Sequence, residues 1–155
     1  MHAQFLQQAI DLAIENVRTG NGGPFGAVIC QDDKVIAACS NIVTCSNDPT
    51  AHAEITAIRA ACQHLNNFQL TNCTLYSSCE PCPMCLGAIY WARLGQVFFA
   101  CNRFDAAQAG FDDSFIYDEI AVTLEKRAIN MQHLEINTAL QPFIAWQKQE
   151  DKIRY

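Results

Sequence analysis

The alternation of apolar and polar residues predicts a regular succession of helices and strands along the chain. Residues 4–18 carry one apolar stripe at helical spacing and Gly20 follows, which indicates an amphipathic helix that ends at a glycine. The apolar runs 27–30 and 35–39 flank a short polar turn and predict a β-hairpin. The central part of the chain adds two strands, over residues 73–77 and 96–100, and two helices, one ending near Leu65 and one running from Pro81 or Pro83 to about Arg93.

The connections between these elements predict the fold class. Thr50 follows the turn 47–49 and is placed to cap the first of the two central helices. Strands that alternate with helices need crossover connections, so we expect parallel strand pairs in one sheet with helices on both faces. The C-terminal third predicts helices over 114–120 and 142–149 and a strand over 132–136. No linker interrupts the pattern, so one domain is expected over residues 1–155.

Length and composition narrow the class of protein. The chain has 155 residues, of which 50% are hydrophobic, so a core can form without disulfides. No apolar stretch is long enough to span a bilayer and no signal peptide is evident, so we expect a cytoplasmic protein with no membrane partner. The net charge of −6 argues against a nucleic acid partner, because such binding rests on Lys and Arg. In an unexported protein, the nine cysteines indicate metal ligands, reactive thiols or buried apolar residues before disulfides.

Two short segments at predicted helix starts carry candidate chemistry. Cys82 and Cys85 are three residues apart, so they share one face of a first helical turn, where the positive end of the helix favours thiolates. His52, at the start of another helix, supplies a third ligand. A Cys₂His set is typical of catalytic zinc, because it leaves the fourth position for water, whose pKa the metal lowers. The alternative is a structural or redox module, in which Cys79 would complete a four-thiolate set; we interpret Cys79 instead as a wall residue.

Glu54 lies two residues after His52 and is the candidate catalytic residue. At a helix N-terminus both side chains can converge on a point beyond the helix end, so Glu54 can approach a zinc-bound water without ligating the metal. A carboxylate there takes a proton from water and passes it to a ring nitrogen and to a leaving amine. The ordered pattern His-x-Glu followed by Pro-Cys-x-x-Cys is the known signature of zinc deaminases. His52, Glu54, Cys82 and Cys85 match it.

The chain resembles the cytidine deaminase-like superfamily over residues 24–120, and within it the short bacterial guanine deaminases. Residues 47–54 are similar to those of tRNA adenosine deaminases as well, whereas the stretches 79–93 and 105–117 are closer to guanine deaminases. This resemblance implies a three-layer α/β/α fold with a central mixed five-stranded sheet, one zinc per chain and a homodimer. It also implies hydrolysis of guanine to xanthine and ammonia by attack at C2 of the ring.

The resemblance further implies which residues contact a purine base. Asn41 ends a predicted strand, where turn chemistry is the alternative role, and Asp113 is the natural acceptor for the N–H groups of guanine, where a helix cap is the alternative. Phe25 and Trp91 are candidates for stacking, although aromatic residues in so apolar a chain are more often core or dimer interface. Tyr155 ends a helix and tail over residues 139–155 that the resemblance places over an active site, of this subunit or its partner; a chain end is more often frayed.

Three rival functions remain open at the level of the sequence. A tRNA adenosine deaminase would need a basic groove, which the net charge of −6 and the acidic stretch around Asp112 disfavour. Deamination of another nucleobase or nucleoside is compatible with the zinc motif alone. A non-catalytic zinc module would show four protein ligands.

Overall fold

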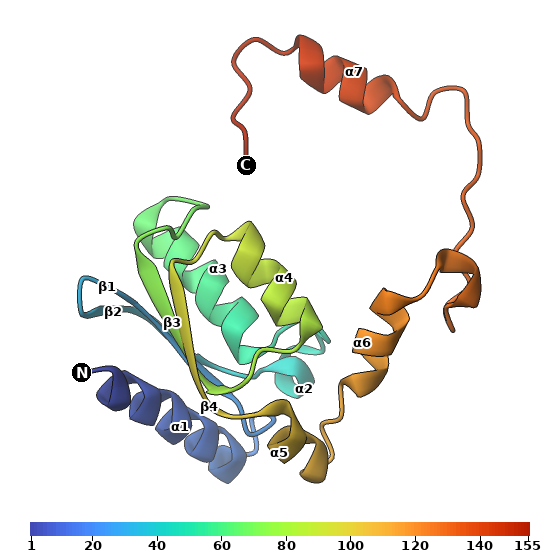
Figure 1. The fold of residues 1–155 in the computed structure, drawn as a ribbon. Coiled ribbons are helices and arrows are strands. Elements are labelled where there is room, and N and C mark those ends of the chain that lie inside the picture. Colours follow the sequence, from blue (N-terminus) through green and yellow to red (C-terminus); the bar gives the residue numbers. More distant parts are fainter. The chain divides into compact units, whose positions relative to one another are not determined.

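A four-stranded sheet forms the centre of residues 1–113 in the computed structural model, which describes residues 1–155 (Figure 1). The strand order is β2 (Lys34–Ser40), β1 (Gly26–Gln31), β3 (Cys73–Cys79) and β4 (Gln96–Cys101). β1 runs antiparallel to both of its neighbours, and β3 and β4 are parallel. The predicted hairpin is confirmed: it turns through Asp32 and Asp33, both with positive φ, as a two-residue hairpin loop requires.

Helices cover both faces of this sheet, which confirms the three-layer α/β/α arrangement (Figure 1). Helix α1 (His2–Thr19) packs on one face, where Phe5 and Ala9 meet Val28 and Tyr76. On the other face, α3 (Ala53–Leu65) and α4 (Pro83–Trp91) enclose a larger core. Side chains of a strand alternate between the two faces, so Leu75 and Ser77 point to the side opposite to Tyr76.

Short helices follow two of the strands and fill the C-terminal unit, residues 114–155. Helix α2 (Val43–Ser46) follows β2, and α5 (Arg103–Gln108) follows β4 with an Asn102 capping box. The C-terminal unit contains α6 (Ser114–Ala121), a 3₁₀ turn (Leu124–Lys126) and α7 (Gln141–Lys148). No helix of the structure is long and apolar enough to cross a membrane.

Three details of the sequence prediction were wrong. The sheet has four strands and not five, because residues 132–136 form no strand: a strand needs a hydrogen-bonding partner, and the C-terminal unit offers none. Only β3 and β4 are a parallel pair, because the crossover through α3 leads from β2 past β1 to β3. Thr50 does not cap α3: its N–H and hydroxyl bond the Asp48 carboxylate, and the helix begins three residues later.

Candidate active site

The N-termini of α3 and α4 deliver the three candidate metal ligands. His52 and Cys82 are the N-cap residues of α3 and α4, both with extended backbone, and neither side chain caps its own helix. Pro83 contributes to this geometry, because a proline disfavours helical backbone at the preceding residue and is itself well suited to the first helical position. Cys85 follows in the first turn of α4 and is fully buried. The two helices pack on the same face of the sheet, so their N-termini meet.

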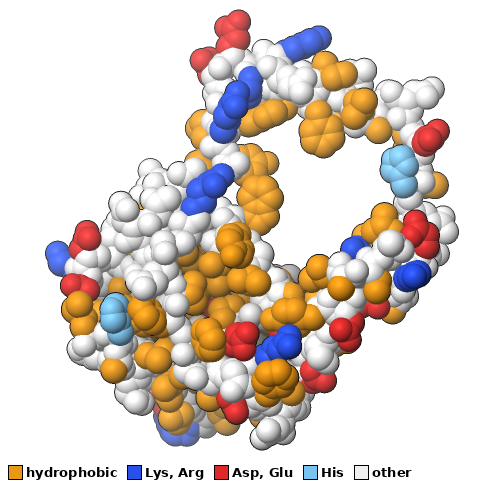
Figure 2. Space-filling model, in the orientation of Figure 1, with side chains coloured by type: hydrophobic (Ala, Val, Ile, Leu, Met, Phe, Trp, Pro, Cys, Tyr) orange, Lys and Arg blue, Asp and Glu red, His pale blue; other side chains and the backbone are white.

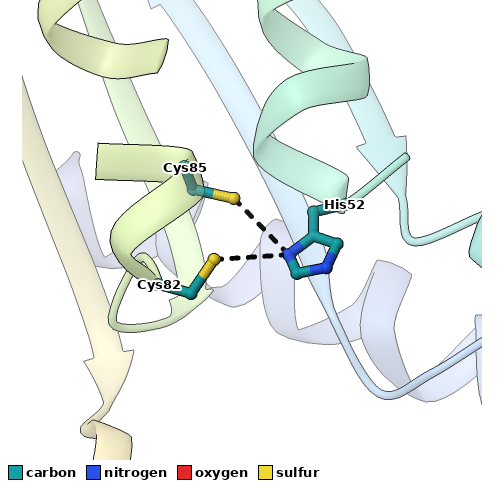
Figure 3. Close-up of side chains that lie close together, drawn as sticks. All are labelled: His52, Cys82 and Cys85. Carbon is teal, nitrogen blue, oxygen red and sulfur yellow. Dashed lines mark hydrogen bonds between the residues drawn. The ribbon is translucent and has the colours of Figure 1, made fainter. Parts of the chain in front are cut away.

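The ligand atoms of His52, Cys82 and Cys85 point toward one another from these helix starts (Figure 3). The Nδ1 atom of His52 lies 3.5 Å from the Sγ atom of Cys82 and 3.5 Å from that of Cys85. All three atoms lie within 4.8 Å of one another, and Cys79 is outside this group. Three convergent ligands of the types N, S and S fit a tetrahedral zinc ion that keeps one open coordination position.

The thiols of Cys82 and Cys85 differ in acidity, and one of them is already in the thiolate form that binds a metal. Hydrogen bonds from Cys85 and from His52 lower the pKa of Cys82 to about 4, so this thiol is a thiolate at neutral pH. The same interaction with Cys82, together with burial, raises the pKa of Cys85. A bound cation would favour the deprotonated form of both, since a coordinating thiol gives up its proton.

Glu54 lies in the first turn of α3 and is buried, with 6% of its surface exposed. Its Oε1 atom lies 3.4 Å from the hydroxyl of Ser77, which points to this face from β3. Burial raises the pKa of the Glu54 carboxyl above its usual range. A buried carboxyl with a raised pKa beside a metal centre is suited to holding and releasing protons.

Two of the predicted base contacts lie beside this centre. The N–H of Ile42 donates to the carbonyl of Ala51, which joins the residue after Asn41 to the residue before His52. Burial raises the pKa of the Asp113 carboxyl, and the negative charge of Cys82 raises it further, so the two groups are close enough to interact electrostatically. The backbone after Asn41 is thus bonded to the segment that leads to His52, and Asp113 interacts electrostatically with Cys82.

Phe25, another predicted base contact, packs against a second aromatic residue. Its ring meets that of Phe111 edge to face, with centroids 4.9 Å apart. The backbone carbonyl of Phe25 accepts a bond from the N–H of Asn41, so the two predicted contacts are neighbours. Sequence reasoning missed Phe111 and Ser77; for Ser77 the signal was a hydroxyl in a strand whose alternate positions on that face are apolar.

Two other predicted contacts, Trp91 and Tyr155, do not lie beside the metal ligands within their own units. Trp91 ends α4, at the opposite end from Cys82, and 69% of its surface is exposed. Tyr155 belongs to the C-terminal unit, where its ring meets Trp146 with centroids 6.4 Å apart and stays 72% exposed.

Comparison with known proteins identifies relatives of this arrangement. Residues 1–101 match the family described as the cytidine and deoxycytidylate deaminase zinc-binding region. The chain is 56% identical to the guanine deaminase of Bacillus subtilis (strain 168) over 99% of both chains, and the X-ray structure of guanine deaminase from that species superposes with a TM-score of 0.98 over 100% of this chain and 99% of the other.

More distant relatives divide between two substrates. The guanine deaminase from Nitrosomonas europaea is 32% identical, with a TM-score of 0.67 over 70% of this chain and 63% of that one. The tRNA-specific adenosine deaminase of Haemophilus influenzae (strain ATCC 51907 / DSM 11121 / KW20 / Rd) is 34% identical over 77% of this chain and 72% of that protein.

Proposed function

This chain belongs to the zinc-dependent deaminases that share the cytidine and deoxycytidylate deaminase zinc-binding region, and on that basis we propose that it hydrolyses guanine to xanthine and ammonia. The full-length similarity to a guanine deaminase supports this substrate over the base of a tRNA. The observation that carries the proposal is the three-ligand metal centre together with the buried carboxyl of Glu54.

His52, Cys82 and Cys85 hold the zinc ion of this family. When bound, zinc supplies the Lewis acidity that makes water a nucleophile at neutral pH. The three side chains use the N, S and S atoms that the ion prefers, and they leave room for one further ligand. Burial of Cys85 and half-burial of the other two keep bulk solvent away from the centre.

Glu54 moves the protons of the reaction. Its carboxylate takes a proton from the attacking water and gives it to N3, the unprotonated ring nitrogen beside C2 of guanine. A second proton from the same water then goes through Glu54 to the amino group that leaves as ammonia. Water and guanine therefore account for every atom of xanthine and ammonia.

Asn41, Asp113 and Phe25 recognise the base in this proposal. The carboxylate of Asp113 accepts from the N1–H and 2-amino groups of guanine, which adenine cannot match because its N1 carries no hydrogen. Asn41 donates to a ring acceptor, and the ring of Phe25 packs against the purine. A purine without N1–H leaves the Asp113 carboxylate unpaired, and such a site rejects the analogue strongly.

The purified protein should therefore release ammonia from guanine and much less from adenine. Asp113→Asn should lower kcat/KM for guanine by at least ~100-fold, because an NH2 donor replaces one of the two acceptor oxygens and faces an N–H group of the base. Asp112→Asn, which removes the neighbouring charge, is the matched control and should retain activity. Intact guanine turnover in Asp113→Asn would leave deamination standing and would refute this account of recognition.

We further propose that the chain acts as a homodimer of single-domain, 155-residue subunits. The helices of the C-terminal unit bury no residue, and large apolar side chains remain exposed in both units (Figure 2). Exposed apolar surface of this extent indicates a protein interface. We propose that the dimer is also the form in which Trp91 and Tyr155 contact the substrate. In the same form, residues 139–155 close the active site of one subunit or of its partner.

Sedimentation equilibrium tests the dimer. The expected mass is twice 17.2 kDa at the concentration used for activity assays. A particle of 17.2 kDa with full guanine turnover would contradict it.

We also propose a cytoplasmic location, because none of the nine cysteines forms a disulfide.

A further inference from the structure

The last buried side chain of helix α1 is an amide, that of Asn16. The buried residues of this helix are Phe5, Ala9, Ala13 and Asn16, so three apolar side chains are followed by one that must be hydrogen-bonded. Only 5% of the Asn16 surface is exposed. Because α1 lies on the sheet face opposite to α3 and α4, Asn16 is not one of the groups assigned above to the chemistry.

The Asn16 side chain joins two loops that carry proposed base contacts. Its Nδ2 atom donates to the carbonyl of Gly23 at 2.8 Å and to the carbonyl of Asn41 at 2.8 Å, so both N–H donors are used. The intervening Gly22 allows this close approach: a Cβ atom there would lie 2.2 Å from the Asn41 carbonyl oxygen and 3.0 Å from Nδ2 of Asn16. One amide on α1 therefore fixes the start of the Phe25 segment and the end of β2.

Asn41 is held at three of its four polar groups. Its N–H donates to the carbonyl of Phe25 at 3.0 Å, its Oδ1 accepts from the N–H of Val43 at 3.2 Å, and its carbonyl accepts from Asn16. The remaining group, Nδ2, makes no hydrogen bond within the protein. The bond from Val43 assigns the amide orientation, so the group left for a ligand is a donor.

We propose that Asn16 is a positioning residue that acts through Asn41, holding it so that its Nδ2 donates to a ring acceptor of the purine. This inference rests on the proposed function, because it takes Asn41 as a base contact. Asn16 also fixes the Gly23 carbonyl and so the segment that carries Phe25. A donor from Asn41 and an acceptor from Asp113 then read two edges of the same base.

A mutant cycle on guanine tests the proposal. Asn16→Ala should lower kcat/KM about tenfold, mainly through a higher KM, because the two hydrogen bonds that orient a ground-state contact are lost. Asn41→Ala should lower it at least as much. The double variant should be no worse than Asn41→Ala alone, since effects that pass through one contact do not add. Asn16→Asp, which keeps the shape but turns an acceptor toward the carbonyl oxygens of Gly23 and Asn41, should lower kcat/KM at least as much as Asn16→Ala.

The matched control is Tyr76→Phe, which removes another hydrogen bond between α1 and the sheet, the one between the Tyr76 hydroxyl and Nδ1 of His2 at 2.7 Å. It should lower the unfolding temperature as Asn16→Ala does, and leave KM unchanged. The inference is overturned if Asn16→Ala behaves like Tyr76→Phe, or if the losses of the two single variants multiply in the double variant.

The mutant cycle is run on whichever purine the wild-type protein turns over. This separates the positioning role of Asn16 from the assignment of guanine as the substrate. Turnover of adenine alone refutes the guanine assignment in the wild type, and the non-additivity of Asn16 and Asn41 still decides the positioning role. A protein with bound zinc that turns over no purine refutes both.

Discussion

Glu54→Gln is expected to lower kcat for guanine by at least ~10²-fold, the scale of general acid–base catalysis, while one zinc per chain remains bound. The amide keeps the size of the side chain and its contact with Ser77, but it cannot take a proton from water and pass it on. Since Glu54 does not ligate the metal, the zinc content should not change. Steady-state kinetics together with elemental analysis of the same preparation measure both quantities.

Glu15→Gln provides the baseline for losing one carboxylate, because Glu15 is an exposed residue of α1 paired with Arg18. It should retain wild-type kcat. Near-normal turnover in zinc-loaded Glu54→Gln would show that another group moves the protons. Loss of zinc in that variant would mean that the carboxylate helps to hold the metal.

Removal of a metal ligand should have a still larger effect. Cys85→Ala is expected to lose zinc and to lose turnover by more than about 10³-fold, because the metal supplies the activation of water. It should also lower the unfolding temperature, since an ion that binds only the folded chain stabilises it. Elemental analysis, kinetics and thermal unfolding follow the three consequences.

Cys79→Ala is the matched control, a thiol-to-methyl change three residues before Cys82. Its Sγ atom contacts the backbone carbonyl of Asn102 at 3.6 Å and lies outside the ligand group. This variant should keep one zinc per chain. Full zinc occupancy in Cys85→Ala would remove that residue from the site, and loss of zinc in Cys79→Ala would favour a four-ligand structural site over a catalytic one.

The metal ligands could be predicted from the sequence because local rules place them. A proline after Cys82 and the spacing of three to Cys85 fix one helix start, and His52 opens another. Each of these features is encoded within a few residues. Their meeting in space also needed both helices to pack on one face of the sheet, which the structure shows and the sequence pattern, with its expected helices on both faces, did not specify.

The failures concern features that depend on which partner a group meets, near or far along the chain. Residues 132–136 have an alternating pattern suited to a strand, but pairing depends on an edge elsewhere in the protein. Thr50 has the chemistry of a helix cap, but its hydroxyl donates to the carboxylate of Asp48 instead. The clamp by Asn16 joins residues 25 positions apart along the chain, and no short motif announces such a contact.

Ammonia release by the purified, zinc-loaded protein is the most direct test of the central claim. Guanine, guanosine, adenine, cytosine and a tRNA are supplied separately, and ammonia and the base product are measured for each. The account predicts ammonia from guanine in a one-to-one ratio with xanthine, and at least ~100-fold lower kcat/KM for adenine. Ammonia from adenine or from the tRNA, with none from guanine, would contradict it.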